Sequence, residues 1–277
     1  MLLASRHAQQ GFTLTELLIT MVITGIIMSA IANAFITQRK SFALQEQISE
    51  MIQNVRVAVD GLVREVRMTG YGVPPASQLS AWIDWVPGFT SNPQITQGLG
   101  SAPDTLSIAT CVDAAKLSVA ANQGATTLTI DAGEDNAFNT TTKKVVYIGR
   151  NEQALITAVT KASGKLLITI DTDPLTPGLQ GIRWSYPADT TPVELLKVIT
   201  YRIVANTLKR DENTGAGAQP LAENVENLQV TPTGNALTLA LTGRTTNADV
   251  GYTHPTRGDQ YRRIEFSSRV WLRNLGL

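Results

Sequence analysis

The stretch that decides the fold lies near the N-terminus, where residues 11–36 read GFTLTELLITMVITGIIMSAIANAFI. Between Phe12 and Ile36 the only ionisable side chain is that of Glu16. A helix over these residues would be about 37 Å long, which is enough to cross the roughly 30 Å hydrocarbon core of a bilayer. The stretch therefore predicts a transmembrane helix over residues 12–36, and it leaves one carboxylate to be explained.

The composition of the whole chain restricts the classes of function. The 277 residues include 23 Lys and Arg and 23 Asp and Glu, so the formal charge is zero and we expect no nucleic-acid partner. Cys111 is the only cysteine, which excludes an intramolecular disulfide and a cysteine-rich metal site. The sequence contains no phosphate-binding loop, dinucleotide fingerprint or zinc spacing. We therefore expect no enzyme, with no catalytic residue, metal or cofactor.

Three interpretations of the N-terminal segment compete. Ala30, Ala32 and Ala34 could form the cleavage site of a secretory signal, but a carboxylate interrupts the apolar run and the helical pattern continues beyond them. A plain membrane anchor explains the length of the segment and gives Glu16 no role. Thr13 and Glu16 also have the spacing of a helix capping box, in which an acid in the first turn complements the helix dipole.

The third interpretation is a prepilin-type leader. Gly11, Phe12 and Glu16, followed by the long apolar run, resemble the class III signal of type IV pilins and type II secretion pseudopilins. The resemblance implies that prepilin peptidase cuts between Gly11 and Phe12, so that residues 1–11 are a leader, and that the new amine of Phe12 is N-methylated. It also implies that Glu16 is the counter-charge during assembly. A positive amine at membrane depth is costly, so it requires an opposite charge. We expect the amine that Glu16 neutralises to be that of a neighbouring subunit.

The helical pattern continues beyond the membrane segment. Apolar residues recur at spacings of three, four and seven from Leu44 to Val66, which predicts an amphipathic helix with one buried face. Arg67 and Gly70 then supply the chemistry of a helix end. We expect one helix over residues 12–70, with its first half in the membrane and its second half packed against a globular head.

The rest of the chain predicts an antiparallel β-sheet head. Residues 71–112 are expected to form a Pro- and Gly-rich loop and the first strand, and residues 182–277 the C-terminal β part. Residues 113–181 are interpreted as an inserted β-subdomain, because residues 117–131 and 155–171 look like two related hairpins. The expected strands cover residues 104–111, 126–131, 143–149, 154–160, 165–171, 193–206, 236–244 and 261–274.

A narrower resemblance concerns the PilW-type minor pilins. The R-x-x-G-Y helix end at residues 67–71 and the closing RVWLRN at residues 269–274 are similar to that group, and the likeness covers residues 11–112 and 190–274. It implies the α+β pilin fold, here with a β-rich insert, and a minor pilin involved in type IV pilus assembly or initiation, incorporated into the pilus or its tip complex. J-type pseudopilins of type II secretion systems share these residues, so they remain an alternative.

The resemblance also implies partners and a location. The partners are other major and minor pilins, reached through the N-terminal helix, together with prepilin peptidase and the pilus assembly platform. The protein would cross the inner membrane once, with its head in the periplasm, and would later be part of an extracellular pilus. A further alternative is a pilus-associated adhesin or binding protein, whose ligand the insert at residues 113–181 would recognise.

Overall fold

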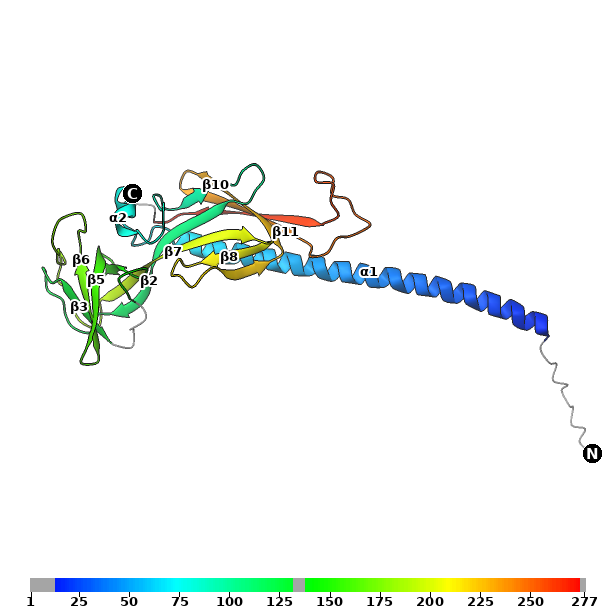
Figure 1. Ribbon diagram of the computed structural model, residues 1–277, viewed down its shortest axis with the longest axis horizontal. Coiled ribbons are helices and arrows are strands. Elements are labelled where there is room, and N and C mark those ends of the chain that lie inside the picture. Colours follow the sequence, from blue (N-terminus) through cyan, green and yellow to red (C-terminus); the bar gives the residue numbers. More distant parts are fainter. Residues whose placement is uncertain (1–12, 132–137, 275–277) are drawn as a thin grey trace, which may run out of the picture. The chain divides into compact units, whose positions relative to one another are not determined.

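The structure, a computed structural model, describes residues 13–131 and 138–274. The chain divides into two compact units, Met1–Ser49 and Glu50–Leu277, and the division falls within one continuous helix, α1 (Leu14–Arg67). A long N-terminal apolar helix followed by an antiparallel β-sheet domain is the α+β architecture that the sequence predicts (Figure 1).

The helix ends slightly before the predicted residue 70. Met68 and Thr69 donate their backbone N–H groups to carbonyls three residues back, at 3.0 and 3.1 Å, so the last turn tightens after Arg67. Gly70 follows with a φ of 87°, a left-handed conformation that glycine adopts without steric cost. Its N–H donates to the carbonyl of Ala109, which ties the end of the helix to the first long strand.

The second unit contains short helical turns and two antiparallel sheets in its described residues. One sheet has the order β1-β2-β7-β4-β5-β6-β3, with β8 paired to β7 and β9 to β8, and the other has the order β10-β11-β12. The elements are η1 (Ala76–Gln78), α2 (Leu79–Trp82), β1 (Gln94–Thr96), β2 (Thr105–Lys116), β3 (Thr127–Asp131), β4 (Val145–Ile148), β5 (Glu152–Ala162), β6 (Lys165–Asp171), β7 (Pro192–Val204), β8 (Thr207–Asp211), β9 (Gln219–Glu223), β10 (Val225–Thr233), β11 (Ala236–Arg244) and β12 (Arg263–Trp271).

Strand β7 organises the larger sheet. It pairs along most of its length with β2, from Leu106↔Tyr201 to Lys116↔Pro192. On its other side, the first half of β7 pairs with β4 and the second half with β8. This single strand therefore connects the part of the sheet near α1 to the part formed by β3, β5 and β6.

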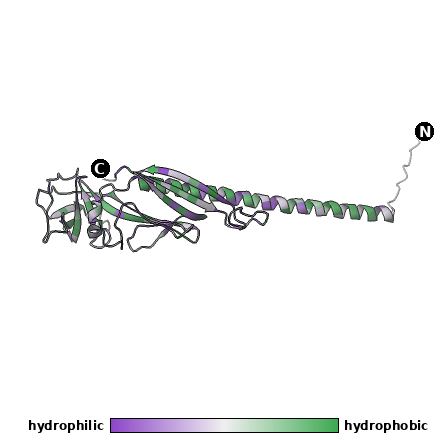
Figure 2. Cartoon of the chain, turned by 90° about the horizontal axis from the view of Figure 1, so that it is seen from above, coloured by the Kyte–Doolittle hydropathy of each residue, from purple (hydrophilic) through white to green (hydrophobic). Residues whose placement is uncertain are grey.

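The apolar side chains form separate cores around these strands. One core joins the C-terminal part of α1 to β2, β7, β8 and the three-stranded sheet, and its centre includes Leu62, Leu106 and Leu239. A second core lies among β3, β4, β5 and β6, with Leu128 and Ile168 at its centre. In β11 buried and half-buried residues alternate over most of the strand, as expected for a sheet with one buried face, and Figure 2 shows the strands of the second unit with both hydrophobic and hydrophilic residues.

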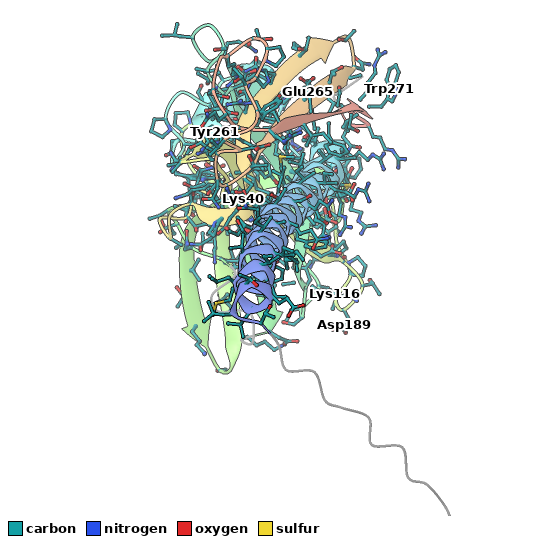
Figure 3. The ribbon with its side chains drawn as sticks, turned by 90° about the vertical axis from the view of Figure 1, so that its right-hand side faces the viewer. Lys40, Lys116, Asp189, Tyr261, Glu265 and Trp271 are labelled. Carbon is teal, nitrogen blue, oxygen red and sulfur yellow. The ribbon has the colours of Figure 1, made fainter. Side chains whose placement is uncertain are left out.

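The strand expected over residues 261–274 is shorter in the structure, where β12 covers Arg263–Trp271. Its alternation of apolar and polar side chains is confirmed. Phe266 packs against the core, Val270 is buried, and Glu265 and Trp271 lie on the outer face (Figure 3). Side chains alternate between the two faces of a strand, so this period of two fixes which face meets α1.

The two expected hairpins within residues 113–181 have different outcomes. Residues 155–171 do form a hairpin, in which β5 and β6 pair through a turn at Ser163 and Gly164. Residues 117–131 do not form a hairpin of two strands: β3 pairs with β6, and the preceding segment joins β3 only through the Leu117↔Ile130 bridge and the hydrogen bonds from Ser118 to the carbonyl of Thr129. The boundaries of the insert stay a prediction, although the strands within it belong to the same sheet as β2 and β7.

Candidate functional site: the first turns of the long helix

The predicted site consists of Gly11, Phe12 and Glu16. Gly11 and Phe12, the residues of the expected cleavage and N-methylation, lie outside the described residues. Glu16 is described, and it lies in the first turn of α1. The structure therefore describes the surroundings of Glu16 and the surface of the helix residues that come after it.

The carboxylate of Glu16 takes part in a capping box. The backbone N–H of Thr13 donates to Glu16 Oε2 at 2.9 Å, and the hydroxyl of Thr13 donates to the same oxygen at 2.9 Å. In return, the N–H of Glu16 donates to Thr13 Oγ1 at 3.3 Å. These contacts satisfy two N–H groups that the start of a helix leaves without partners. Thr13 and Glu16 therefore form the capping box that their spacing suggests, and Thr13 is the residue that orients Glu16.

The residues after Glu16 form a continuous apolar surface. Large apolar side chains from Leu14 to Phe42 are exposed, with Leu14 at 78% and Ile26 at 65% of their full accessibility. By length and composition α1 is able to cross a membrane, and its most apolar window has no buried residue. Figure 2 shows this half of the helix as predominantly hydrophobic. A helix that is apolar all round fits a lipid environment or contact with other apolar helices.

Two threonines in this part of the helix have local hydrogen-bond partners. The hydroxyls of Thr20 and Thr37 donate to backbone carbonyls of the preceding turn, each at 2.9 Å. Within a bilayer an unpaired polar group is costly, so such internal hydrogen bonds make the threonines compatible with lipid. Charges return at Arg39, whose guanidinium lies 4.7 Å from the centroid of the Phe35 ring, and at Lys40 (Figure 3).

The second part of α1 is held by the sheet domain. Met51, Val55, Ala58, Leu62 and Val66 are buried, at the three- and four-residue spacing that the amphipathic pattern predicts. The change from exposed to buried apolar residues within one helix separates a surface available to other molecules from a surface used by the fold.

A charged contact of Glu65, which was not predicted from the sequence, also joins α1 to the sheet domain. Glu65 accepts hydrogen bonds from the hydroxyl of Tyr201 and from Arg210 Nε, the latter at 3.1 Å. Burial, and then the hydrogen bond to Glu65, raise the pKa of Tyr201, so its hydroxyl remains a donor. The only sequence signal is an acid beside the apolar stripe, and its partners are 136 and 145 residues away in the chain.

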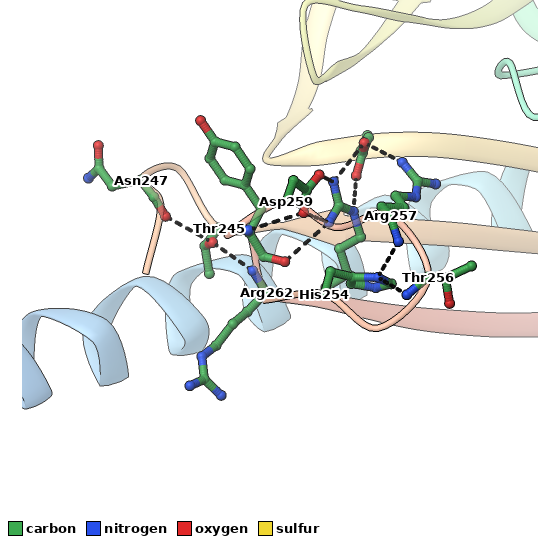
Figure 4. A network of polar contacts seen from close by, with 10 residues as sticks. Thr245, Asn247, His254, Thr256, Arg257, Asp259 and Arg262 are labelled. Atoms are coloured by element: carbon green, nitrogen blue, oxygen red, sulfur yellow. Dashed lines mark hydrogen bonds and ion pairs between the residues drawn. The ribbon is translucent and has the colours of Figure 1, made fainter. Parts of the chain in front are cut away.

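A second network, also missed, fixes the segment between β11 and β12 (Figure 4). Arg263, whose side chain is 7% exposed, contacts Glu226 and Asp259 at 2.6 and 2.7 Å. His254 Nδ1 accepts the backbone N–H groups of Thr256 and Arg257. These contacts account for His254 as a residue that shapes a turn.

Comparison with known families gives one result, and it falls on the first turns of α1. The family described as "Prokaryotic N-terminal methylation motif" matches residues 6–32. Comparison with curated proteins and with solved structures found no match. The matched range contains Gly11, Phe12 and Glu16 together with the first half of the apolar surface. This motif is the signal of type IV pilins and pseudopilins, so it supports a pilin-like protein with a structural role.

Proposed function

We propose that the chain is a minor pilin of the PilW type that takes part in type IV pilus assembly or initiation. The observation that carries the proposal is the methylation motif at residues 6–32, placed directly before an exposed apolar helix. In this proposal prepilin peptidase cuts after Gly11, the amine of Phe12 is methylated, and the chain enters the pilus or its tip complex. In this proposal the chain is a structural element, and the motion and energy for assembly come from a separate ATPase and the platform protein.

The location follows from the same helix. The proposed protein crosses the inner membrane once through residues 12–36, with the sheet domain in the periplasm until the subunit leaves the membrane. The apolar surface of α1 then exchanges lipid for the equivalent helices of other major and minor pilins. The two environments are equally apolar, so the transfer needs specific polar contacts to fix the register of the helices.

Glu16 supplies such a contact. Cleavage creates a positive amine at Phe12, and a carboxylate about 4 Å away interacts with it by roughly 4 kcal/mol at an effective dielectric constant near 20. Desolvation of both groups consumes much of this energy, so the pair acts mainly by specifying the register of the subunits. The capping box with Thr13 holds the carboxylate in the first turn before assembly.

A pair of variants separates the two roles of Glu16. Glutamine at this position keeps the acceptor oxygen of a capping box and removes the charge. We therefore expect Glu16→Gln and Glu16→Ala to insert into the membrane normally and to be absent from purified pili, as measured by quantitative immunoblotting of sheared filaments. Glu46→Gln is the matched control, because Glu46 is an exposed glutamate farther along α1. Normal incorporation of Glu16→Gln would show that the residue only caps the helix.

A deletion strain distinguishes the proposed system from the J-type pseudopilin. Loss of surface pili with normal protein secretion supports the pilus assignment. Loss of secretion with normal pili overturns it, while the methylation motif would still support a pilin-like protein.

A further inference from the structure

A pocket of about 490 Å³ opens in the second unit, where the end of β2 meets the start of β7. A register shift in β2 between Asp113 and Ala115 interrupts the ladder at this point. The volume is in the range of sites for small ligands. The lining includes Asp113, Ala115, Lys116, Arg150, Thr190 and Pro192.

Arg150 reaches this pocket from a strained turn between β4 and β5. Gly149 and Arg150 both have a φ of 59°, and the N–H of Asn151 donates to the carbonyl of Ile148 at 3.0 Å. These features define a turn with left-handed backbone at both central residues, within the three-residue connection 149–151 that joins Ile148 to its paired residue Glu152. An arginine there is held against its backbone preference, and such strain is concentrated at functional positions. The hydroxyl of Tyr147 stabilises the turn by donating to the carbonyl of Arg150 at 2.7 Å.

A buried carboxylate orients the guanidinium of Arg150. Glu194 exposes 2% of its side chain, and its Oε1 accepts from Arg150 Nε and from the hydroxyl of Tyr71, each at 3.0 Å. Burial, and then Glu194, raise the pKa of Tyr71 to about 12, so the phenol remains a neutral donor. Because Glu194 engages the Nε edge, the terminal nitrogens of the guanidinium are the ones left on the solvent side.

The solvent side carries a second cation and a limited amount of negative charge. Arg150 Nη2 lies 4.0 Å from Asp113 Oδ1, which is longer than a hydrogen bond, and the Asp113 side chain is 79% exposed. Lys116 lines the same pocket. Asp189 lies beside Lys116 (Figure 3), since its N–H donates to the carbonyl of Leu117 at 2.7 Å. Asp113 and Asp189 balance Arg150 and Lys116, and Glu194 adds a third negative charge behind Arg150. This balance opposes a dianion such as phosphate more strongly than a singly charged anion.

We propose that this pocket binds a ligand through a carboxylate group, which accepts hydrogen bonds from the terminal nitrogens of Arg150 and from Lys116. The planar guanidinium matches a carboxylate with two parallel hydrogen bonds. Asp113 competes for the same nitrogens, so it weakens the site. Glu194 is a positioning residue, because it acts on the ligand only through Arg150.

Isothermal titration calorimetry of the full-length mature chain in neutral detergent at low salt tests the site. Glucuronate and N-acetylglutamate are the two carboxylate probes, which distinguish a sugar acid from a peptide side chain. Inorganic phosphate and the neutral methyl ester of glucuronate are the controls. We expect at least one carboxylate probe to bind, phosphate to bind more weakly, and the ester not to bind. Failure of both carboxylate probes overturns the proposal.

Matched variants locate the binding. Arg150→Gln is expected to lower the affinity for the bound probe at least tenfold, and Lys116→Gln severalfold. Arg183→Gln, at an exposed arginine of the same unit, is expected to leave the affinity unchanged. Asp113→Asn is expected to strengthen binding severalfold. This variant also keeps the test decisive if Arg150→Gln fails to fold, because the Asp113 side chain is largely exposed. Unchanged affinity in Asp113→Asn and Lys116→Gln contradicts the assignment.

Discussion

Glu65 is the residue through which the long helix makes a charged contact with the sheet domain. Its carboxylate lies between Tyr201, which is fully buried, and Arg210, which also contacts Glu212 at 2.7 Å. The side chains of Glu65 and Arg210 are 32% and 25% exposed, so solvent screens part of their attraction. The larger consequence of losing Glu65 is that the buried hydroxyl of Tyr201 loses its acceptor.

We expect Glu65→Ala to lower the free energy of unfolding by about 2 kcal/mol, the usual cost of removing a charged partner from a buried hydrogen bond. Urea unfolding in detergent, followed by tryptophan fluorescence, measures it. Glu50→Ala serves as the control, because this glutamate is exposed on the same helix, and its effect should stay within about 0.5 kcal/mol. Equal effects in the two variants would show that the Glu65 network contributes nothing.

Asp259 gives the segment between β11 and β12 a dependence on pH. The hydrogen bond from Arg263 lowers the pKa of Asp259 from 3.8 to about 2. A carboxyl group with a lowered pKa stabilises the fold above its ordinary pKa, and this stabilisation is lost as the pH falls toward the lowered value. We therefore expect the urea midpoint to decrease between about pH 4 and pH 2. In Asp259→Asn the midpoint at neutral pH should be lower and this decrease smaller; an unchanged profile would count against the contact.

The N-terminal site and the two networks differ in what the sequence can offer. Gly11, Phe12 and Glu16 lie within six consecutive positions, so a local motif is sufficient to propose them. Glu65 and Arg263 have partners that are distant in the chain, and only the pairing of the strands brings them together. Such contacts have no local signal, because any exposed strand or helix carries acids and bases of the same kind.

At the scale of elements, the fit between α1 and β11 depends on the absence of a side chain at Gly243. A Cβ atom there would lie 2.4 Å from Val55 Cγ2 and 2.9 Å from Met51 Cγ. Val55 is fully buried and β-branched, so it has little freedom to move away. Glycine in a strand often marks such a close approach.

This contact predicts opposite effects for two glycine substitutions. Gly243→Ala should lower the free energy of unfolding by about 1–3 kcal/mol through overpacking. Gly61→Ala should raise it by about 0.5–1 kcal/mol, since alanine favours a helix interior and the nearest atom to its Cβ would be Leu221 Cδ2 at 3.8 Å. The same urea titration compares the two variants. A neutral or stabilising Gly243→Ala would contradict the close approach of α1 and β11.

The strands found from sequence are those with strong apolar alternation. The expected strands at residues 165–171 and 236–244 coincide with β6 and β11. In contrast, the expected strands do not include β8, β9 or β10, whose sequences TLKRD, QPLAE and VENLQVTPT are polar or contain proline. Strands of this kind form because they have partners in the sheets: β8 pairs with β7, β9 with β8, and β10 with β11. The local sequence does not reveal these pairings.

For the whole molecule, the two halves of α1 have different roles. Its first half exposes an apolar surface for lipid or for other subunits, and its second half is part of the core of the sheet domain. Residues 6–32, with the methylation motif, lie entirely in or before the exposed half. The account therefore depends on whether the leader is removed, because only cleavage creates the amine that Glu16 is proposed to neutralise.

Mass spectrometry of the N-terminal peptide from the membrane-inserted or filament-bound protein tests this claim most directly. We expect a chain that begins at Phe12 with a methyl group on its amine, and a prepilin peptidase deletion strain in which residues 1–11 remain. A mature chain that retains Met1 or Leu2 in the presence of the peptidase would contradict it. A chain that begins at Phe35 would likewise contradict it, and would indicate an ordinary secretory signal.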